Sequence, residues 1–538
     1  MKTECYPISI LPHMSRLFLD FCERQEPLAP FYTASAYSTE WMTAPIRLSP
    51  SNRASLCDLL EEENGGFGAS NSKIDENLNR LREGAGAVVT GQQVTLFGGP
   101  LFTLLKAATA IRKARDASAS GRPHVPVFWL ATEDHDLAEA NQVAFPADGE
   151  LRTLRAEIDQ PSALPVGRIP LGNGIEAVLE QAAAILGPGP FLDDLVACYR
   201  PGATFSQAFG GLISRVFSGQ GLIVLDASSR VFHAFGKSVL REAIVRADEL
   251  HTALMDRDQQ LRAAGYHSQV LVPSHSSLLF LIDSASGARV PLRRTHSGDW
   301  QAARRSYTSS ELLAILDEEP ERLSPNALLR PVFQDSILPT SVYIGGPAEI
   351  AYFAQSQVLY ERILGRTTPV LPRLSATLIE PPVASVLAQH ELSLQDVIEA
   401  ALKDPLELAH RLGARAMPIE AKRKLASAGN ALEQELSALT SYMHSVSQSL
   451  GNASDVAASK MRYQMNRLRR LAANDQLKRE ESLTRHAEAI LLNLFPNRHP
   501  QERVLGAAWF LSRYGDVLPE VLIEQAGQQC PGHKAIWL

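Results

Sequence analysis

The chain has 538 residues, more than one domain usually holds, so two or more structural units are expected. With 45% hydrophobic and 21% charged residues its composition is that of a soluble protein, and its net charge of −7 excludes a general nucleic-acid-binding surface. The apolar runs fall far short of the ~20 residues that cross a bilayer, and Pro7 and Pro12 interrupt the one N-terminal segment that resembles a signal sequence. We expect a cytoplasmic protein that binds neither nucleic acid nor membrane.

The strongest local pattern lies in residues 88–141, which read as strand, glycine-rich loop, helix and second strand. A β-branched run ends at Gly91, and apolar residues follow at helical spacing from Leu101. Residues 125–131 then predict a buried strand. The order predicts a βαβ unit whose helix begins at the glycines.

The glycine-rich loop suits an anion, because the start of a helix carries unpaired N–H groups and a partial positive charge. A phosphate or carboxylate would fit there, with Lys106 adding specificity. Gly-Gly-Pro is equally a simple helix start, and neither GxGxxG nor GxxxxGK[ST] occurs here. The candidate binding residues of this loop are Thr90, Gly91, Gln92, Gln93, Gly98 and Gly99.

Four polar residues follow the second strand, where an open α/β sheet keeps its ligand crevice: Glu133, Asp134, His135 and Asp136. Carboxylates beside a histidine can hold Mg²⁺, bind an amino group or relay a proton, and solvated turn charges would look similar. Three acids around one histidine are unfavourable unless a cation or partner compensates them. We take all four as candidate catalytic residues.

Two segments are predicted to be insertions into the core. Pro and Gly punctuate residues 151–210, and residues 266–322 alternate as a β-hairpin would. The core continues between them over residues 211–265. A buried strand there ends at Asp226, which fits either the crevice or ordinary turn chemistry.

Residues 323–385 repeat the order strand, Gly-Gly-Pro, helix. Two such helix starts could face one crevice from either half of a sheet, or they coincide as common helix-start signals. A strand over 369–377 carries Arg373, which could clamp a carboxylate or phosphate, or serve the structure alone. The candidate binding residues of this segment are Asn326, Arg330, Gln334, Asp335, Gly345, Gly346, Arg373 and Ser375.

Long helical segments dominate residues 386–500. Apolar residues from Leu425 to Leu450 advance by sevens or by fours and threes, as in a coiled-coil seam. We expect a break at Gly451-Asn452 and a second helix that returns antiparallel. Each arm of ~30 residues would be about 45 Å long, too long for one compact core to bury, which predicts a homodimer. The run of arginines near Arg469 fits a solvated face better than a nucleic-acid site.

Five cysteines lie far apart, without a paired spacing: Cys5, Cys22, Cys57, Cys198 and Cys530. We expect reduced thiols. Cys530 and His533 together offer two metal ligands, but a zinc site needs more, so no structural metal is expected.

Six motifs, in order along nearly the whole chain, resemble the bacillithiol-biosynthesis cysteine-adding enzyme family, the cysteine ligases: TGQQ…LFGGPLFTLLK, VPVFW…EDHD, LSPNALLRPVFQD…LPT, YIGGPAEIAYFAQ, LPRLSATLIE and FP…QER. One departure is Thr95, where that family usually has glycine.

The resemblance implies the fold class α/β, a Rossmann-like parallel-sheet core with two inserted connecting-peptide modules and an α-helical antiparallel coiled-coil domain for dimerisation. The predicted units are the first core half (1–150), insertion 1 (151–210), core (211–265), β-rich insertion 2 (266–322), second core half (323–385), coiled-coil domain (386–500) and a C-terminal helix returning to the core (501–538).

The resemblance also implies a reaction, in which L-cysteine is joined to glucosaminyl-malate by an amide on the sugar amine to give bacillithiol. Amide formation from a free carboxylate is uphill in water, so we expect ATP with Mg²⁺ to activate the cysteine carboxylate. Gly98, Gly99 and Gln92 would lie near the phosphates, with Asp134 to Asp136 orienting the amine or a metal. The alternatives are a nucleotide-using transferase acting on another amine, and a nucleotide- or sugar-binding scaffold that supports another ligase.

Overall fold

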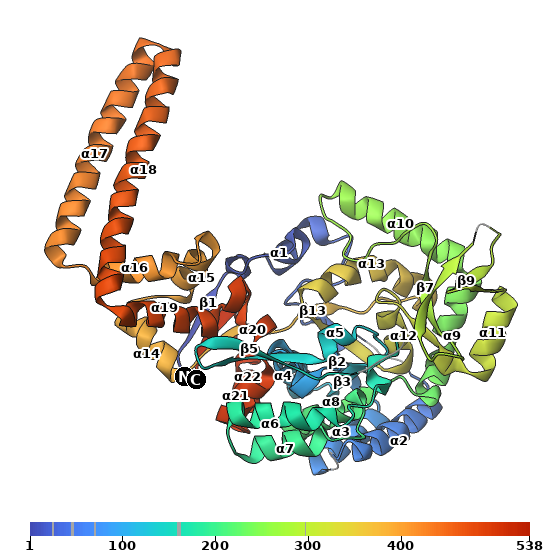
Figure 1. The fold of residues 1–538 in the computed structure, drawn as a ribbon. Helices are drawn as coiled ribbons and strands as arrows, with labels where there is room; N and C mark the ends of the chain where they lie inside the picture. Colours follow the sequence, from blue (N-terminus) through green and yellow to red (C-terminus); the bar gives the residue numbers. More distant parts are fainter. Residues whose placement is uncertain (24–25, 45–47, 69–70, 159–162, 296) are drawn as a thin grey trace.

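A computed structural model describes residues 1–538 apart from 24–25, 45–47, 69–70, 159–162 and 296. Insertion 1 is therefore described without positions 159–162. A mixed α/β body carries the two chain ends side by side, and a long helical hairpin projects from it (Figure 1). Among the described residues, no helix combines the length and apolar character needed to cross a bilayer.

The centre of the body is a five-stranded parallel sheet in the order β13-β12-β2-β3-β6. Its strands are β2 (Gly86–Gln93), β3 (His124–Ala131), β6 (Ile223–Asp226), β12 (Thr340–Gly345) and β13 (Val370–Pro372). The chain passes from β2 to β3 and β6 on one side and returns to β12 on the other. The strand order thus reverses between β2 and β12, the position at which open α/β sheets bind ligands.

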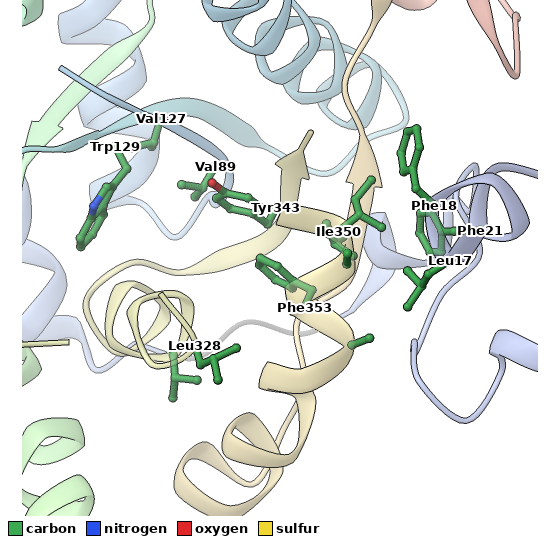
Figure 2. Packing of buried hydrophobic residues seen from close by; sticks show 14 of the residues in the cluster. Leu17, Phe18, Phe21, Val89, Val127, Trp129, Leu328, Tyr343, Ile350 and Phe353 are labelled. Carbon is green, nitrogen blue, oxygen red and sulfur yellow. The ribbon is translucent and has the colours of Figure 1, made fainter. Parts of the chain in front are cut away.

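Alternate residues of the central strands face opposite sides of the sheet. Val89, Val127 and Trp129 join one apolar cluster, whereas Phe128 and Leu130 join another. Figure 2 shows the first face, where helix α13 (Pro347–Leu364) brings Ile350 and Phe353 against it. The remaining helices of the body's first half are α1 (Arg16–Glu23), α2 (Pro50–Gly66), α3 (Ser72–Arg82), α4 (Phe102–Ala119) and α5 (Leu137–Ala140).

Two local predictions in the first βαβ unit differ from the structure. Strand β2 runs through Gly91 to Gln93 and does not end at the glycine. A Cβ on Gly91 would lie 2.9 Å from the backbone oxygen of Trp129, so the glycine permits close approach of β2 and β3. Helix α4 begins at Phe102, after a tight turn in which Phe97, Gly98 and Gly99 all have positive φ.

The two insertions have different architectures. The first follows the antiparallel pair β4 (Gln142–Ala147) and β5 (Glu150–Arg155) and is helical. Its helices are α6 (Gly174–Leu186), α7 (Pro190–Cys198) and α8 (Phe205–Phe217), the last leading back into the core. The second forms an antiparallel sheet in the order β10-β9-β8-β7-β11, comprising β7 (Ser276–Ile282), β8 (Arg289–Arg294), β9 (Trp300–Ala302), β10 (Arg305–Tyr307) and β11 (Leu323–Pro325). The helices of this part of the chain are α9 (Arg230–Val245), α10 (Ala247–Ala263), α11 (Ser309–Glu318) and α12 (Arg330–Ile337), of which α9 and α10 contact β7.

The strand predicted over 369–377 is two strands in different sheets. β13 closes one edge of the central sheet, while β14 (Ser375–Ile379) pairs with β15 (His533–Trp537) in a three-stranded sheet completed by β1 (Thr3–Tyr6). The C-terminal return to the core comprises α20 (Gln501–Val504), α21 (Ala507–Tyr514), α22 (Val517–Gly527) and β15, more elements than the single helix predicted.

The prediction that all cysteines are reduced is wrong for one pair. Cys5 and Cys530 form a disulfide across a sequence separation of 525 residues, with Cα atoms 5.8 Å apart. β1 and β15 are adjacent antiparallel strands, so the fold brings the two chain ends within bonding distance. Cys22, Cys57 and Cys198 are free and buried.

The C-terminal unit is helical, with α14 (Pro381–Gln389), α15 (Leu394–Lys403), α16 (Glu407–Ala416) and α19 (Glu481–Leu494) at the base of a hairpin formed by α17 (Ile419–Val446) and α18 (Gln448–Arg479) (Figure 1). The break lies at Ser447, whose hydroxyl caps α18 by accepting from the N–H of Leu450, and not at Gly451-Asn452. Leu436 is buried in the seam, whereas other apolar side chains of the hairpin, including Tyr442 and Tyr463, are exposed.

Candidate active site

Two adjoining cavities open at the carboxyl ends of the central strands. The insertion cavity, about 700 Å³, lies between the ends of β3 and β6 and the second insertion. The switch-point cavity, about 440 Å³, lies between the ends of β2 and β12. Trp129, Ala131, Asp134 and Arg330 line both. The two spaces therefore meet at the end of β3 and the start of α12.

Lys106 of α4 forms the floor of the switch-point cavity. Its ammonium donates to the Gly91 carbonyl (2.7 Å) and to Gln92 Oε1 (3.0 Å), and lies 2.5 Å from Glu349 Oε2. Burial lowers the pKa of Lys106, with Glu349 opposing that shift. Burial acts to raise the pKa of Glu349, but Lys106 and the Gly346 N–H hold it below its ordinary value. The pair is thus an internal salt bridge with no donor left over.

Two arginines of the same cavity lack such a partner. Arg330 donates to Gln334 Oε1 (3.0 Å) and to the Tyr352 hydroxyl (2.9 Å), both uncharged groups. Arg503, from the C-terminal return, also lines the cavity. Neither arginine forms an ion pair with any residue that the structure describes. An anionic ligand would supply the missing counter-charge.

Arg373 does clamp a carboxylate, but it is one from the protein itself. Its guanidinium donates to both oxygens of Glu502, at 2.7 and 3.0 Å, with both side chains almost fully buried. Ser375 donates to the same carboxylate and is 2.8 Å from His533 Nδ1. Arg373 reaches the switch-point cavity, whereas Ser375 lies behind it and fixes β14 to β15.

The insertion cavity holds His135 beside a buried arginine. Arg289 donates to Ser324 Oγ (3.0 Å) and to the Pro325 carbonyl (2.9 Å), and its guanidinium carbon lies 3.7 Å from the centre of the Phe280 ring. Its remaining nitrogen, Nη1, is 3.5 Å from His135 Nδ1. Burial lowers the pKa of Arg289, opposed by Glu133 and Asp134. Because a guanidinium only donates, His135 Nδ1 is the acceptor in this contact.

The four polar residues after β3 point in different directions. Asp134 lines both cavities, His135 lines the insertion cavity, and Glu133 approaches the buried ring of His233 with Oε1 2.9 Å from Nε2. Asp136 caps α5 by accepting from the N–H of Glu139. Three of the four candidate catalytic residues therefore reach a cavity.

Only some residues of the first glycine-rich loop line a cavity. Gln92 and Gln93 line the switch-point cavity with Gly91, and the Thr90 hydroxyl joins β2 to β12 through the Ile344 carbonyl. Gly98 and Gly99 line neither cavity. The N–H of Gly98 donates to the Tyr199 hydroxyl, and the N–H groups of Ala507 and Leu101 pair with the carbonyls of Gly99 and Leu505.

The start of α4 is thus covered by the C-terminal return and offers no open anion site. The structure thus places Gly98 and Gly99 outside both cavities, and phosphate binding at these glycines stays a prediction. The second loop differs, since Gly346 lines the switch-point cavity at the start of α13 and donates its N–H to Glu349. Gly345 lies one residue earlier, and its carbonyl accepts from the N–H of Arg373.

The other predicted residues support the walls. Asn326 lines the insertion cavity and caps the turn before α12. Gln334 and Asp335 are buried behind Arg330, joined to each other and to the Tyr360 hydroxyl. Asp226 accepts from Thr132 (2.6 Å) and the N–H of Ser228, which is turn chemistry at the end of β6. Burial and the nearby Asp226 carboxylate raise the pKa of Glu63 to about 9.

Several residues of the two cavities were not predicted from the sequence: Arg289, Tyr343, Glu349, Tyr352 and Arg503. His233, which is buried behind Glu133, was not predicted either. Glu349 and Arg503 fall inside the motifs YIGGPAEIAYFAQ and QER, which was the available signal. His233 and Arg289 lie outside every quoted motif. They join the site only because α9 and β8 fold over the end of β3.

Comparison with known proteins covers the whole chain. Residues 1–374 match the family described as bacillithiol biosynthesis BshC, N-terminal Rossmann-like domain, and residues 376–537 match the C-terminal coiled-coil domain of the same description. Relatives named "Putative cysteine ligase BshC" include one from Koribacter versatilis (42% identical, covering 100% of both chains), one from Solibacter usitatus (35%, 100% of both) and one from Salinibacter ruber (29%, 98% and 97%). The chain therefore belongs to the bacillithiol-biosynthesis BshC family, with its Rossmann-like core and coiled-coil domain.

Proposed function

We propose that the protein is a cytoplasmic ligase that joins L-cysteine to glucosaminyl-malate through an amide on the sugar amine, the step that yields bacillithiol. The observation that carries the proposal is the pair of cavities that share Trp129, Ala131, Asp134 and Arg330. A ligase must hold two substrates with their reacting atoms in contact. Two spaces that meet at one wall suit that requirement better than a single closed pocket does.

The malyl group of glucosaminyl-malate fits the switch-point cavity. A malyl group carries two carboxylates, and Arg330 and Arg503 are the two cavity arginines without an acidic partner among the described residues. Lys106 and Arg373 are already neutralised by Glu349 and Glu502. With the malyl group held there, the sugar amine would extend toward the shared wall at Asp134.

The activated cysteine then occupies the insertion cavity. At about 700 Å³ this space is within the range of about 300–1,000 Å³ typical of small-molecule sites. ATP, entering as its Mg²⁺ complex, would supply the leaving group that activates the cysteine carboxylate. His135 and Arg289 are the donors placed to hold a phosphate or a carboxylate oxygen there. As the amine attacks, Asp134 at the shared wall is the nearest candidate to orient it.

The proposal is tested by incubating purified protein with cysteine, glucosaminyl-malate and Mg-ATP and following thiol product and nucleotide together by mass spectrometry. Product with AMP and pyrophosphate identifies an adenylating ligase, and product with ADP an acyl-phosphate route. Bound substrates without product would refute the ligase and favour a scaffold that supports another enzyme.

A substitution of Arg503 tests which cavity binds which substrate. The Arg503 side chain is exposed, so replacing it should leave the fold intact. We expect Arg503→Met to raise the KM for glucosaminyl-malate about 10- to 150-fold, as for a lost charged hydrogen bond of about 1.5–3 kcal/mol, with the KM for cysteine unchanged. Arg467→Met on the hairpin is the matched control and should change neither value. Equal effects of Arg503→Met on both substrates would contradict the assignment of the cavities.

We also propose that the α17–α18 hairpin mediates a homodimer. Several of its apolar side chains are exposed in the single chain, and Leu439, Tyr442, Val446 and Tyr463 are each at least 48% exposed. Apolar side chains gathered on one projecting element are typical of a protein interface. Light scattering coupled to size-exclusion chromatography should give a molar mass twice the chain mass of 58.8 kDa. The mass of a monomer at micromolar concentration would exclude this interface.

A further inference from the structure

A buried histidine, His233 of α9, faces an oxygen atom with each of its ring nitrogens. Its ring is fully buried, with Nδ1 3.1 Å from the Pro320 carbonyl and Nε2 2.9 Å from Glu133 Oε1. A carbonyl oxygen can only accept, so Nδ1 carries a hydrogen. Nε2 has no hydrogen-bond partner among the described residues, so the Glu133 oxygen lies against it as a close polar contact.

The buried ring holds the Glu133 carboxylate in position. Phe333 of α12 packs on the His233 ring, with the two ring centres 5.3 Å apart. Nδ1 ties the ring to the Pro320 carbonyl, which leaves Nε2 directed at Glu133. The contact with His233 thus fixes one oxygen of Glu133 at the wall of the insertion cavity.

Glu133 also reaches the insertion cavity. It lines that cavity with 19% of its side chain exposed, and only Oε1 faces His233. Oε2 has no hydrogen-bond partner within the described part of the chain. A carboxylate oxygen without a protein partner is therefore presented to a space whose neighbouring walls include the apolar side chains of Trp129 and Leu279. Such a group in such surroundings suits a cationic ligand.

The other charges around the pair do not fill this role. Arg289, across the cavity, has two of its nitrogens bonded to Ser324 and Pro325 and a third directed at His135. Arg230 on α9 is 3.7 Å from Glu321, beside Pro320. Asp134 and His135 follow Glu133 in the chain, and the Asp134 side chain is more exposed, at 46%. Glu133 is thus the cavity carboxylate fixed by a buried partner.

We propose that Glu133, held in position by His233, binds the protonated amino group of the amino-acid substrate in the insertion cavity. This rests on the proposed function in placing cysteine in that cavity. Glu133 is then a specificity residue for α-amino thiols. A protonated amino group has no free electron pair, so the amino group of the bound cysteine cannot itself act as a nucleophile.

The test compares the binding of L-cysteine and of 3-mercaptopropionate, which lacks the amino group, by titration calorimetry on the full chain. For the wild-type protein we expect cysteine to bind about 10- to 150-fold tighter, the range for a charged hydrogen bond of about 1.5–3 kcal/mol. Glu133→Gln should reduce this ratio to near one by weakening cysteine alone. Glu139→Gln, at the switch-point cavity, is the matched control and should keep the wild-type ratio.

A wild-type ratio near one, or a Glu133→Gln ratio as high as that of the wild type, would overturn the proposal. This measurement does not need turnover, so a failed ligase assay with a ratio that falls in Glu133→Gln would refute the ligase and leave the amino-group site standing.

Discussion

The Arg373–Glu502 pair gives a sharp test of how the C-terminal return is attached to the core. Glu502→Gln keeps the shape of the side chain and removes its charge, leaving the Arg373 guanidinium buried with only neutral acceptors. Glu502 is 1% exposed and also accepts from the N–H of Ala376 (2.9 Å). Burial acts to raise the pKa of Glu502, but Arg373 holds it below its ordinary value. Breaking a buried pair of this kind costs about 3–5 kcal/mol.

The loss in the free energy of unfolding can be measured by urea unfolding, with tryptophan fluorescence as the signal. The five tryptophans all lie outside the α17–α18 hairpin, so the signal reports the body. Glu420→Gln is the matched control, because its pair with Lys424 is 79% and 78% exposed and contributes within about 0.5 kcal/mol. The double variant Arg373→Met/Glu502→Leu should recover much of the loss, since no buried charge is left unpaired. A Glu502→Gln protein within about 1 kcal/mol of wild type would refute this reasoning.

Three further outcomes follow from single features of the fold. Burial lowers the pKa of His533 to about 4. The unfolded chain, with a histidine pKa of about 6.5, therefore binds the extra proton first as pH falls, and about 3 kcal/mol of stability is lost between pH 6.5 and 4. In His533→Asn, the urea midpoint of unfolding should no longer fall by this amount between pH 6.5 and 4. The same fall in the variant as in the wild type would contradict the assignment of this stability loss to His533. Gly91→Ala should destabilise by about 1–3 kcal/mol, because its Cβ would meet a backbone oxygen at 2.9 Å, whereas Gly66→Ala, with open space, should not. Thiol titration in denaturant should find three free thiols before reduction and five after, and five at the outset would exclude the Cys5–Cys530 bond.

The sequence predicts the architecture well because its strongest signals are local. The buried strands ending at Ala131 and Asp226 and the helix after Pro347 are each visible in their own apolar spacing. Spacing does not say which sheet a strand joins, so 369–377 was predicted as one strand although Arg373 lies at the change of sheet. Pairing partners come from distant parts of the chain and leave no local trace.

The same limit applies to the site. The position of Asp134 and His135 followed from the rule that ligands bind at the ends of parallel strands. The rule for glycine-rich helix starts could not show that Gly98 lies outside both cavities, because the helix start there is covered by a segment some 400 residues later in the chain. His233 could not be found from the sequence, since a lone histidine on an amphipathic helix carries no sign of the carboxylate that it meets.

The bond between the first and last strands changes the connectivity of the whole molecule. With Cys5 and Cys530 joined, the linear polypeptide becomes a covalent ring with short tails. A tension applied to the two ends would pass through the sulfur atoms and leave the residues between them unloaded. A single backbone cut in the hairpin would likewise open the ring without releasing a fragment, so the nicked protein would still migrate as one species until a reductant is added.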